Sequence, residues 1–217
     1  MIPHKFPRPF GFYAVLTDPV KGYDYCTRLF VDYEIAFVQL RMKDVPHSSV
    51  IETAQAMREI TRGTATRFIV NDDPEIAREV GADGVHLGQG DMSYGEAQKI
   101  VGKDAIIGLS THSVQQVSNA CELAPDYAGM GPVYATPTKK NPDPVIGLAG
   151  LTEMLDRSTV PGVAIGGITL ENLPLVLEAG ARNFCMVRPI TTASDPEKVL
   201  KTILRIHKTF FSDSPRT

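Results

Sequence analysis

The sequence predicts an α/β protein, a single (β/α)8 barrel of the TIM-barrel type. Eight short apolar runs, rich in β-branched and aromatic residues, recur along the 217 residues, and glycine or polar residues follow each run. Segments with the apolar spacing of helices lie between many of these runs, which is the order expected of a parallel sheet with crossover helices. The runs are almost continuously apolar, as strands are when both faces of a sheet are covered.

The predicted elements follow one another along the whole chain. In order, the strands are Phe12–Thr17, Ala36–Arg41, Arg67–Asp72, Gly84–Gln89, Ile106–Thr111, Tyr127–Val133, Gly162–Gly167 and Asn183–Arg188. Helical spacing is clearest in the segments Ser48–Thr61, Tyr94–Val101, Val114–Leu123, Leu170–Ala179 and Asp195–Lys208. We expect one domain over residues 1–217, with its core at about 12–208. Periodicity does not show closure, so an open doubly wound sheet is the alternative fold.

Composition and charge exclude several classes of protein. Lys and Arg number 22 against 25 Asp and Glu, without a long run of either sign, which argues against a nucleic-acid or membrane-surface binder. We find no apolar stretch long enough to span a membrane, and Met1–Gly11 lacks the apolar block of a secretory signal. Cys26, Cys121 and Cys185 match neither a disulfide framework nor a zinc site, so we expect a reduced, cytoplasmic protein.

Three donor side chains end the second predicted strand, and the chemistry of such barrels lies in the loops after the strands. With a period of two, Gln39, Arg41 and Lys43 point to one side. One amide and two cations that converge suit an anion with several charges. The alternative is a solvated strand end whose charges face water.

Carboxylates follow the third and fourth predicted strands, close to these cations. A divalent cation reconciles the two signs of charge, because Mg²⁺ takes one or two protein carboxylates together with phosphate oxygens. Asp72 and Asp91 are therefore the predicted Mg²⁺ ligands, bridging to a diphosphate. Capping of the next helix is the alternative for Asp72, and it is the better explanation for Asp73, which directly precedes Pro74.

The later strands lead into loops that suit a second anion. Gly166 and Gly167 follow the seventh strand, Val187 and Arg188 end the eighth, and the loops after these two strands are the common phosphate site of barrels. The connection Gly131–Pro144 is long, which is typical of a binding loop. Glycines that only turn the chain and an ordinary exposed loop are the alternatives. Two anion sites at one barrel mouth suit an enzyme that joins a diphosphate donor to a phosphorylated acceptor.

The motifs at these strand ends, taken together, resemble the thiamine phosphate synthase family. They are QLRMK (Gln39–Lys43), IVND (Ile69–Asp72), GADGVHLGQGD (Gly81–Asp91), GLSTH (Gly108–His112), GPVYATPTKK (Gly131–Lys140) and AIGGI (Ala164–Ile168), in order within about Phe12 to Leu204. The resemblance implies a Mg²⁺-dependent transferase of thiamine biosynthesis. Such an enzyme condenses 4-amino-2-methyl-5-(diphosphooxymethyl)pyrimidine with 4-methyl-5-(2-phosphooxyethyl)thiazole and releases thiamine phosphate and pyrophosphate.

The resemblance also implies roles for single residues. The catalytic residues would be Arg41, Lys43, Ser110 and Lys139. The pyrimidine diphosphate would contact Gln39, Leu40, Arg41, Met42, Lys43, Asn71, Ser110 and Lys139. The thiazole phosphate would contact Thr136, Pro137, Thr138, Gly167, Val187 and Arg188, and Mg²⁺ would bind Asp72 and Asp91. The chain departs from the family at Val187 and Arg188, where many members have serine and a small residue, and Pro189 cannot donate a hydrogen bond.

Two other functions fit the same fold. A thiazole tautomerase resembles the synthase, and His112 stands where it could place its histidine, but a tautomerase holds no diphosphate and leaves Arg41 and Asp91 unexplained. A non-catalytic barrel that binds thiamine phosphate or a precursor would show binding without turnover. The sequence does not determine whether the chain forms a homo-oligomer, or whether the acceptor is the thiazole phosphate or its carboxylated precursor.

Overall fold

The computed structural model describes residues 5–137 and 143–212, and within them eight parallel strands close into a barrel. The strands are β1 (Phe12–Leu16), β2 (Phe37–Leu40), β3 (Arg67–Asn71), β4 (Gly84–Leu87), β5 (Ile106–Thr111), β6 (Tyr127–Met130), β7 (Gly162–Ala164) and β8 (Asn183–Cys185). β1 pairs with β8, Tyr13 beside Cys185, and this pairing closes the sheet. The closure confirms the predicted (β/α)8 barrel and excludes the open doubly wound sheet.

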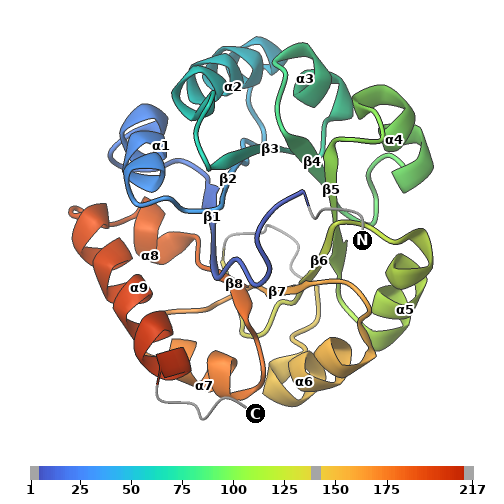
Figure 1. Ribbon diagram of the computed structural model, residues 1–217, viewed down its shortest axis with the longest axis vertical. Coiled ribbons are helices and arrows are strands. Elements are labelled where there is room, and N and C mark those ends of the chain that lie inside the picture. Colours follow the sequence, from blue (N-terminus) through green and yellow to red (C-terminus); the bar gives the residue numbers. More distant parts are fainter. Residues whose placement is uncertain (1–4, 138–142, 213–217) are drawn as a thin grey trace.

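Helices surround the strands as a ring (Figure 1). They are α1 (Tyr23–Asp32), α2 (His47–Thr61), α3 (Pro74–Glu79), α4 (Tyr94–Val101), α5 (Val114–Leu123), α6 (Gly147–Arg157), α7 (Leu173–Glu178), α8 (Arg188–Thr191) and α9 (Pro196–Ser212). The hydroxyls of Ser93 and Ser113 cap α4 and α5, which explains why both helices begin where we predicted. Over the described residues, we find no helix that is both long and apolar enough to cross a membrane.

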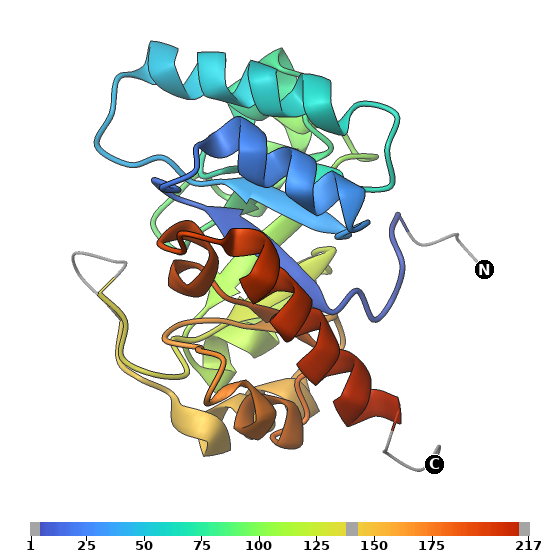
Figure 2. The same ribbon diagram turned by 90° about the vertical axis from the view of Figure 1, so that its left-hand side faces the viewer.

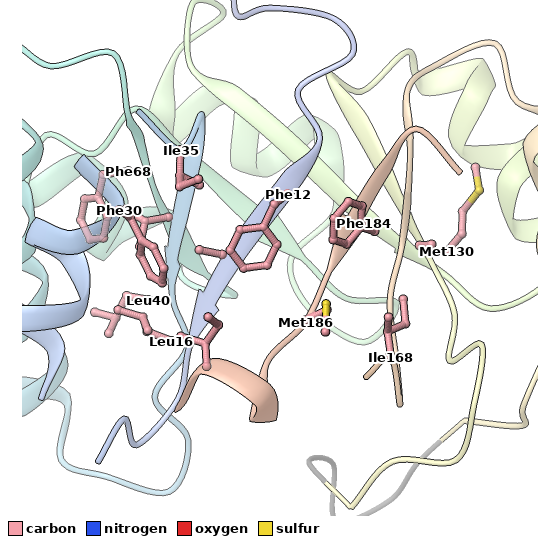
Figure 3. Close-up of a cluster of buried hydrophobic side chains, with 14 of the residues drawn as sticks. Phe12, Leu16, Phe30, Ile35, Leu40, Phe68, Met130, Ile168, Phe184 and Met186 are labelled. Atoms are coloured by element: carbon pink, nitrogen blue, oxygen red, sulfur yellow. The ribbon is translucent and has the colours of Figure 1, made fainter. Parts of the chain in front are cut away.

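Successive strand side chains alternate between the barrel interior and the layer beneath the helices. In β1, Tyr13 and Val15 belong to the interior cluster, whereas Phe12 and Leu16 belong to the outer cluster. Figure 3 shows part of the outer cluster, in which Phe30 of α1 lies among residues of the strands. Both faces of each strand are therefore buried, and this explains the continuous apolar runs in the sequence.

The N-terminal segment closes the end of the barrel at which the strands begin. Phe6 is only 5% exposed and packs against Phe10 and Phe37, with ring centroids 5.6 and 4.8 Å away. Lys5 Nζ lies 3.0 Å from the Asp126 carboxylate and ties the segment to the barrel. Figure 2 shows this segment at one end of the barrel and the connection after β6 at the other. We expected the core to begin at about residue 12, but it already includes Phe6.

The last three strands each end three residues earlier than predicted, and the first of them, β6, ends at Met130 rather than Val133. β7 ends at Ala164 because Gly166 and Gly167 have φ angles of 98° and 64°, which a strand cannot continue. A Cβ on Gly166 would lie 2.5 Å from Pro132 Cα, so glycine also allows the loops after β6 and β7 to touch. Arg188, which we expected to end β8, instead begins the short helix α8.

The start of α7 also differs from the prediction. The helix begins at Leu173 rather than Leu170. Before it, the Thr169 N–H donates to Asn172 Oδ1 at 2.8 Å, and Asn172 Nδ2 donates to the Gly167 carbonyl at 3.0 Å. Residues 168–172 therefore form a turn anchored to the loop after β7, rather than the first turn of a helix.

Candidate active site

A cavity of about 530 Å³ opens at the carboxyl ends of the strands. This is the end of the barrel opposite the N-terminal segment. Most of the predicted site residues line the cavity: Gln39, Arg41, Lys43, Asn71, Asp72, Asp91, Ser110, Thr136, Pro137, Gly167, Val187 and Arg188. The barrel thus brings the residues of both predicted anion sites into one cavity. Which part of a substrate each residue binds stays a prediction.

The strand alternation divides the residues that follow β2 into two groups. Gln39, Arg41 and Lys43 all line the cavity, as the period of two predicts. The side chains of Leu40 and Met42 instead pack in the outer apolar cluster beneath the helices. Any contact of Leu40 or Met42 with a ligand is therefore confined to backbone atoms, in contrast to the side-chain contacts expected of their neighbours.

Two carboxyl groups meet in the cavity wall at the ends of β3 and β4. Asp72 has a φ of 67°, a left-handed conformation that Asp tolerates better than most residues, and its carboxylate forms an ion pair with Lys43. Asp91 Oδ2 accepts a hydrogen bond of 2.7 Å from the Gly88 N–H. Burial raises the pKa of Asp91, and its contact with the Asp72 carboxyl raises it further. This pair is best stabilised by a shared proton or by a cation.

The donor set at this pair fits Mg²⁺. The ion prefers oxygen ligands, and it commonly binds through one or two protein carboxylates and completes its coordination with water and substrate phosphate. Asp72 and Asp91 supply such a pair beside two cationic side chains. Among the described residues there is no group of three or more His, Cys, Asp or Glu that could hold a metal by itself. The site therefore suits an ion that binds together with its substrate.

Asp73, the neighbour of this pair, is the helix cap that we predicted. Its Oδ1 accepts hydrogen bonds from the Glu75 and Ile76 N–H groups, each 2.9 Å long, at the start of α3. Pro74 occupies the first turn, where its missing N–H leaves no hydrogen bond unmade. Adjacent aspartates thus serve separate purposes, one in the cavity and one in the helix.

A line of hydrogen-bonding side chains, which we call the interior network, joins the barrel interior to the cavity. It consists of Tyr13, Tyr127, His86 and Ser110. The two phenol oxygens lie 2.7 Å apart, Tyr127 OH lies 3.1 Å from His86 Nδ1, and His86 Nε2 lies 2.9 Å from Ser110 Oγ. His86 is not among the site residues predicted from the sequence. The period of two in β4 could have placed His86 inside the barrel, but its contact with Ser110 depends on the register between β4 and β5.

The opposite wall of the cavity comes from the loops after β7 and β8. Gly167, Val187 and Arg188 line it, together with Thr169 from the turn before α7. Pro189 follows Arg188 in the first turn of α8 and has no N–H to offer. An anion bound here would therefore rely on the Arg188 side chain and on the loop backbone.

His112 links the loop after β5 to the connection after β6. Its Nδ1 donates to the Gly131 carbonyl at 2.5 Å, and its Nε2 lies 3.3 Å from the Asp143 carboxylate. Both ring nitrogens face protein oxygens, which favours the structural role over the acid–base role. Thr138 and Lys139, which we also expect in the site, lie outside the described residues.

Comparisons with known proteins identify the family of this chain. A family model described as thiamine monophosphate synthase matches residues 23–190. The thiamine-phosphate synthase of Caldicellulosiruptor bescii is 40% identical over 183 residues, which cover 84% of this chain and 84% of that protein. The thiamine-phosphate synthase of Gloeobacter violaceus is 43% identical over 162 residues, which cover 75% of this chain but 47% of that longer protein.

Solved structures show the same similarity in three dimensions. Thiamine phosphate pyrophosphorylase from Pyrococcus furiosus superposes with a TM-score of 0.84 at 29% identity, covering 95% of this chain and 98% of that one. A 3-hexulose-6-phosphate synthase superposes with a TM-score of 0.68 at 15% identity, over 90% of this chain and 99% of that one. The second match shows the barrel fold alone.

Proposed function

Because this chain belongs to the thiamine monophosphate synthase family, we propose that it catalyses the reaction of that family. It is a transferase of thiamine biosynthesis that condenses 4-amino-2-methyl-5-(diphosphooxymethyl)pyrimidine with 4-methyl-5-(2-phosphooxyethyl)thiazole. The products are thiamine phosphate and pyrophosphate.

Besides the family, one observation of the structure supports the proposal: residues that suit an anion line two walls of a single cavity. Arg41 and Lys43 stand on one wall beside the carboxyl pair, and Gly167 and Arg188 stand on the other. The first wall suits a diphosphate bound with a metal ion, and the second suits a monophosphate. A reaction between a diphosphate donor and a phosphorylated acceptor requires both anions to bind at once.

We propose Mg²⁺ as the cofactor, bound by Asp72 and Asp91. The contact between their carboxyl groups and the raised pKa of Asp91 support this proposal, because a divalent cation would relieve the repulsion between the two charges. When bound, the ion neutralises negative charge on the diphosphate.

The side chains of the first wall stabilise the departing group. The bond between the pyrimidine methylene carbon and the diphosphate oxygen breaks, and its electron pair leaves with pyrophosphate. The lone pair of the thiazole nitrogen then forms the new bond to that carbon, so a protein nucleophile is not required. Arg41, Lys43 and, by family resemblance, Lys139 attract the leaving group more strongly as its charge grows, which lowers the barrier. The connection after β6, through Thr136 and Pro137, helps to exclude water that could intercept the methylene carbon.

A coupling assay tests the proposal. Purified protein is mixed with both substrates and Mg²⁺, with and without EDTA, and thiamine phosphate is measured after oxidation to its fluorescent thiochrome. We expect product that disappears with EDTA. Arg41→Gln should reduce turnover strongly. Arg62→Gln, which removes an equivalent charge from an exposed ion pair with Glu59 on α2, should not.

Other results would correct specific parts of the proposal. Product that is insensitive to EDTA would keep the reaction and remove the metal. Thiazole tautomerisation without coupling, or ligand binding without any turnover, would overturn the proposed reaction in favour of the tautomerase or the non-catalytic barrel.

A further inference from the structure

The two phenols of the interior network determine which way its hydrogen bonds run. Tyr13 and Tyr127 are 2% and 1% exposed, and burial raises the pKa of both phenols, so each keeps its proton at neutral pH. Within the described part of the chain, the Tyr13 hydroxyl has the Tyr127 hydroxyl as its one hydrogen-bond partner. The Tyr127 hydroxyl has two partners, Tyr13 and His86 Nδ1. Each of the two phenolic protons must therefore find its acceptor among the Tyr13 oxygen, the Tyr127 oxygen and His86 Nδ1.

Only one arrangement pairs both protons. Tyr13 donates to Tyr127, and Tyr127 donates to His86 Nδ1, which accepts only when it carries no proton. Nδ1 carries a proton in the other neutral tautomer and in the imidazolium ion. It would then donate to the Tyr127 oxygen and could not accept the Tyr127 proton. One of the two phenolic protons would then have no acceptor, and an unpaired buried donor is costly.

We propose that Tyr127 holds His86 as the neutral tautomer protonated at Nε2, and that His86 thereby makes Ser110 a hydrogen-bond donor to the substrate. His86 Nε2–H donates to Ser110 Oγ at 2.9 Å, so the Ser110 hydroxyl proton points away from His86. Both His86 and Ser110 line the cavity. His86 is in this sense a positioning residue, because it acts through Ser110.

The acceptor of the Ser110 proton is an anionic oxygen of the diphosphate substrate. Arg41 and Lys43 line the same cavity and draw that anion into it. The Ser110 backbone is also held in place, because Gln89 Nε2 donates to its carbonyl oxygen at 2.6 Å. The identity of this ligand rests on the proposed function, whereas the tautomer of His86 does not.

Nitrogen NMR of the histidine rings tests the tautomer without any substrate. The protein is labelled with ¹⁵N-histidine at neutral pH, and the spectrum of His86→Gln identifies the His86 signals among those of the five histidines. We expect a pyrrole-like shift at Nε2 and a pyridine-like shift at Nδ1 in the wild-type protein. A protonated Nδ1, alone or together with a protonated Nε2, would overturn the proposal.

Two matched variants separate this role of Tyr127 from general packing. Tyr127→Phe removes the donor to Nδ1, and we expect the two neutral tautomers to mix. Tyr13→Phe removes a hydroxyl from the same aromatic cluster, but it leaves His86 Nδ1 as the acceptor of the Tyr127 proton, so the Nε2–H tautomer should persist. An unchanged tautomer in Tyr127→Phe, or equal changes in both variants, would contradict the proposal. Thermal unfolding confirms that each variant is folded.

Kinetics then test the effect on Ser110. We expect Tyr127→Phe to lower kcat on the order of tenfold, with a smaller change in KM. The reason is that the Ser110 hydroxyl, as a donor, acts most strongly on the charge that develops on the diphosphate during the reaction. His86→Gln, whose amide N–H can still donate to Ser110, should retain more activity than His86→Leu. Equal activities of these two variants would exclude the positioning role. A protein with no coupling activity would refute the proposed function, while the ring-nitrogen shifts would still decide the tautomer.

Discussion

At the scale of single residues, backbone conformation decides what adjacent and chemically identical side chains do. Asp72 has a φ of 67° and directs its carboxylate to Lys43 in the cavity. Asp73 has a φ of −111° and directs its carboxylate to the backbone N–H groups of α3. The residue type permits both uses, and the position relative to the strand end selects between them.

Asp91 should be essential for turnover without being needed for the fold. Its raised pKa means that the ionised carboxyl is less favourable in the folded protein than in the unfolded chain. Above that pKa, Asp91→Ala therefore removes an unfavourable charge, so the Tm should not fall for electrostatic reasons. Turnover should fall by roughly a hundredfold or more through loss of the metal site. Coupling assays and thermal unfolding measure the two effects, and near-normal activity would remove Asp91 from the metal site.

Cys121 should react with thiol reagents before the other two cysteines. Partial burial raises its pKa, but the hydrogen bond from the Thr159 N–H and the contact with the Ser158 hydroxyl outweigh burial and lower the pKa overall. Burial raises the pKa of Cys26 to about 11 and that of Cys185 to about 12. Short exposure to iodoacetamide at increasing pH, followed by peptide mass spectrometry, should show Cys121 modified first. Cys121→Ser removes this early signal, and equal labelling of all three thiols would contradict the prediction.

At the scale of elements, the predictions succeeded where the signal was local and failed where a neighbouring loop decided the boundary. α4 and α5 begin after serine caps and have their predicted bounds. We predicted that β7 extends to Gly167 because Gly166 and Gly167 continue an apolar run. In the structure, their positive φ angles end the strand before them. Pro132 in another loop leaves no room for a Cβ at Gly166, and a neighbour 34 positions away leaves no local signal.

The Asp73 cap makes a prediction about α3. Asp73→Ala should lower the free energy of unfolding by about 1 kcal/mol, the usual cost of losing an N-cap. In a protein of this size the Tm should fall by about 2–4 °C. The kcat should stay unchanged, because Asp73 holds the helix and not the substrate. Asp73→Ser, which restores a capping oxygen, should recover most of the loss, and a kcat that falls with Asp73→Ala would place this residue in the site.

At the scale of the whole molecule, the two ends of the barrel have separate tasks. The end at which the strands begin is filled by aromatic rings, including Phe6 and Phe37. The carboxyl ends carry the cavity and the predicted ligands. Substitutions at the first end, outside the interior network, should therefore change stability, and substitutions at the second should change activity.

Phe6 offers a test of this separation. Phe6→Ala should lower the free energy of unfolding by about 3 kcal/mol, because it removes a buried ring and leaves a cavity. The kcat at a temperature where the variant is folded should match the wild-type value. Urea unfolding measures the loss, with Val20→Ala, an exposed apolar position, as the control that changes stability by less than about 0.5 kcal/mol. A Phe6→Ala variant as stable as the control would show that the N-terminal segment does not support the barrel.

The sequence by itself determined what depends on local periodicity and residue type. It indicated eight strands, the strand-then-helix order, the inward face shared by Arg41 and Lys43, and the cap at Asp73. The spacing of side chains along one element follows from helix and strand geometry, so these features can be read from the residues alone. The tertiary structure added what depends on residues far apart in the chain.

Closure of the barrel, burial of Phe6 under the strands, and the contacts of His86 with Ser110 and Tyr127 are features of this second kind. Each depends on the register between neighbouring strands or on how the chain returns to its own start. A shift of one residue in that register moves an inward side chain to the outer face. Only the folded structure therefore decides which inward-pointing groups become partners.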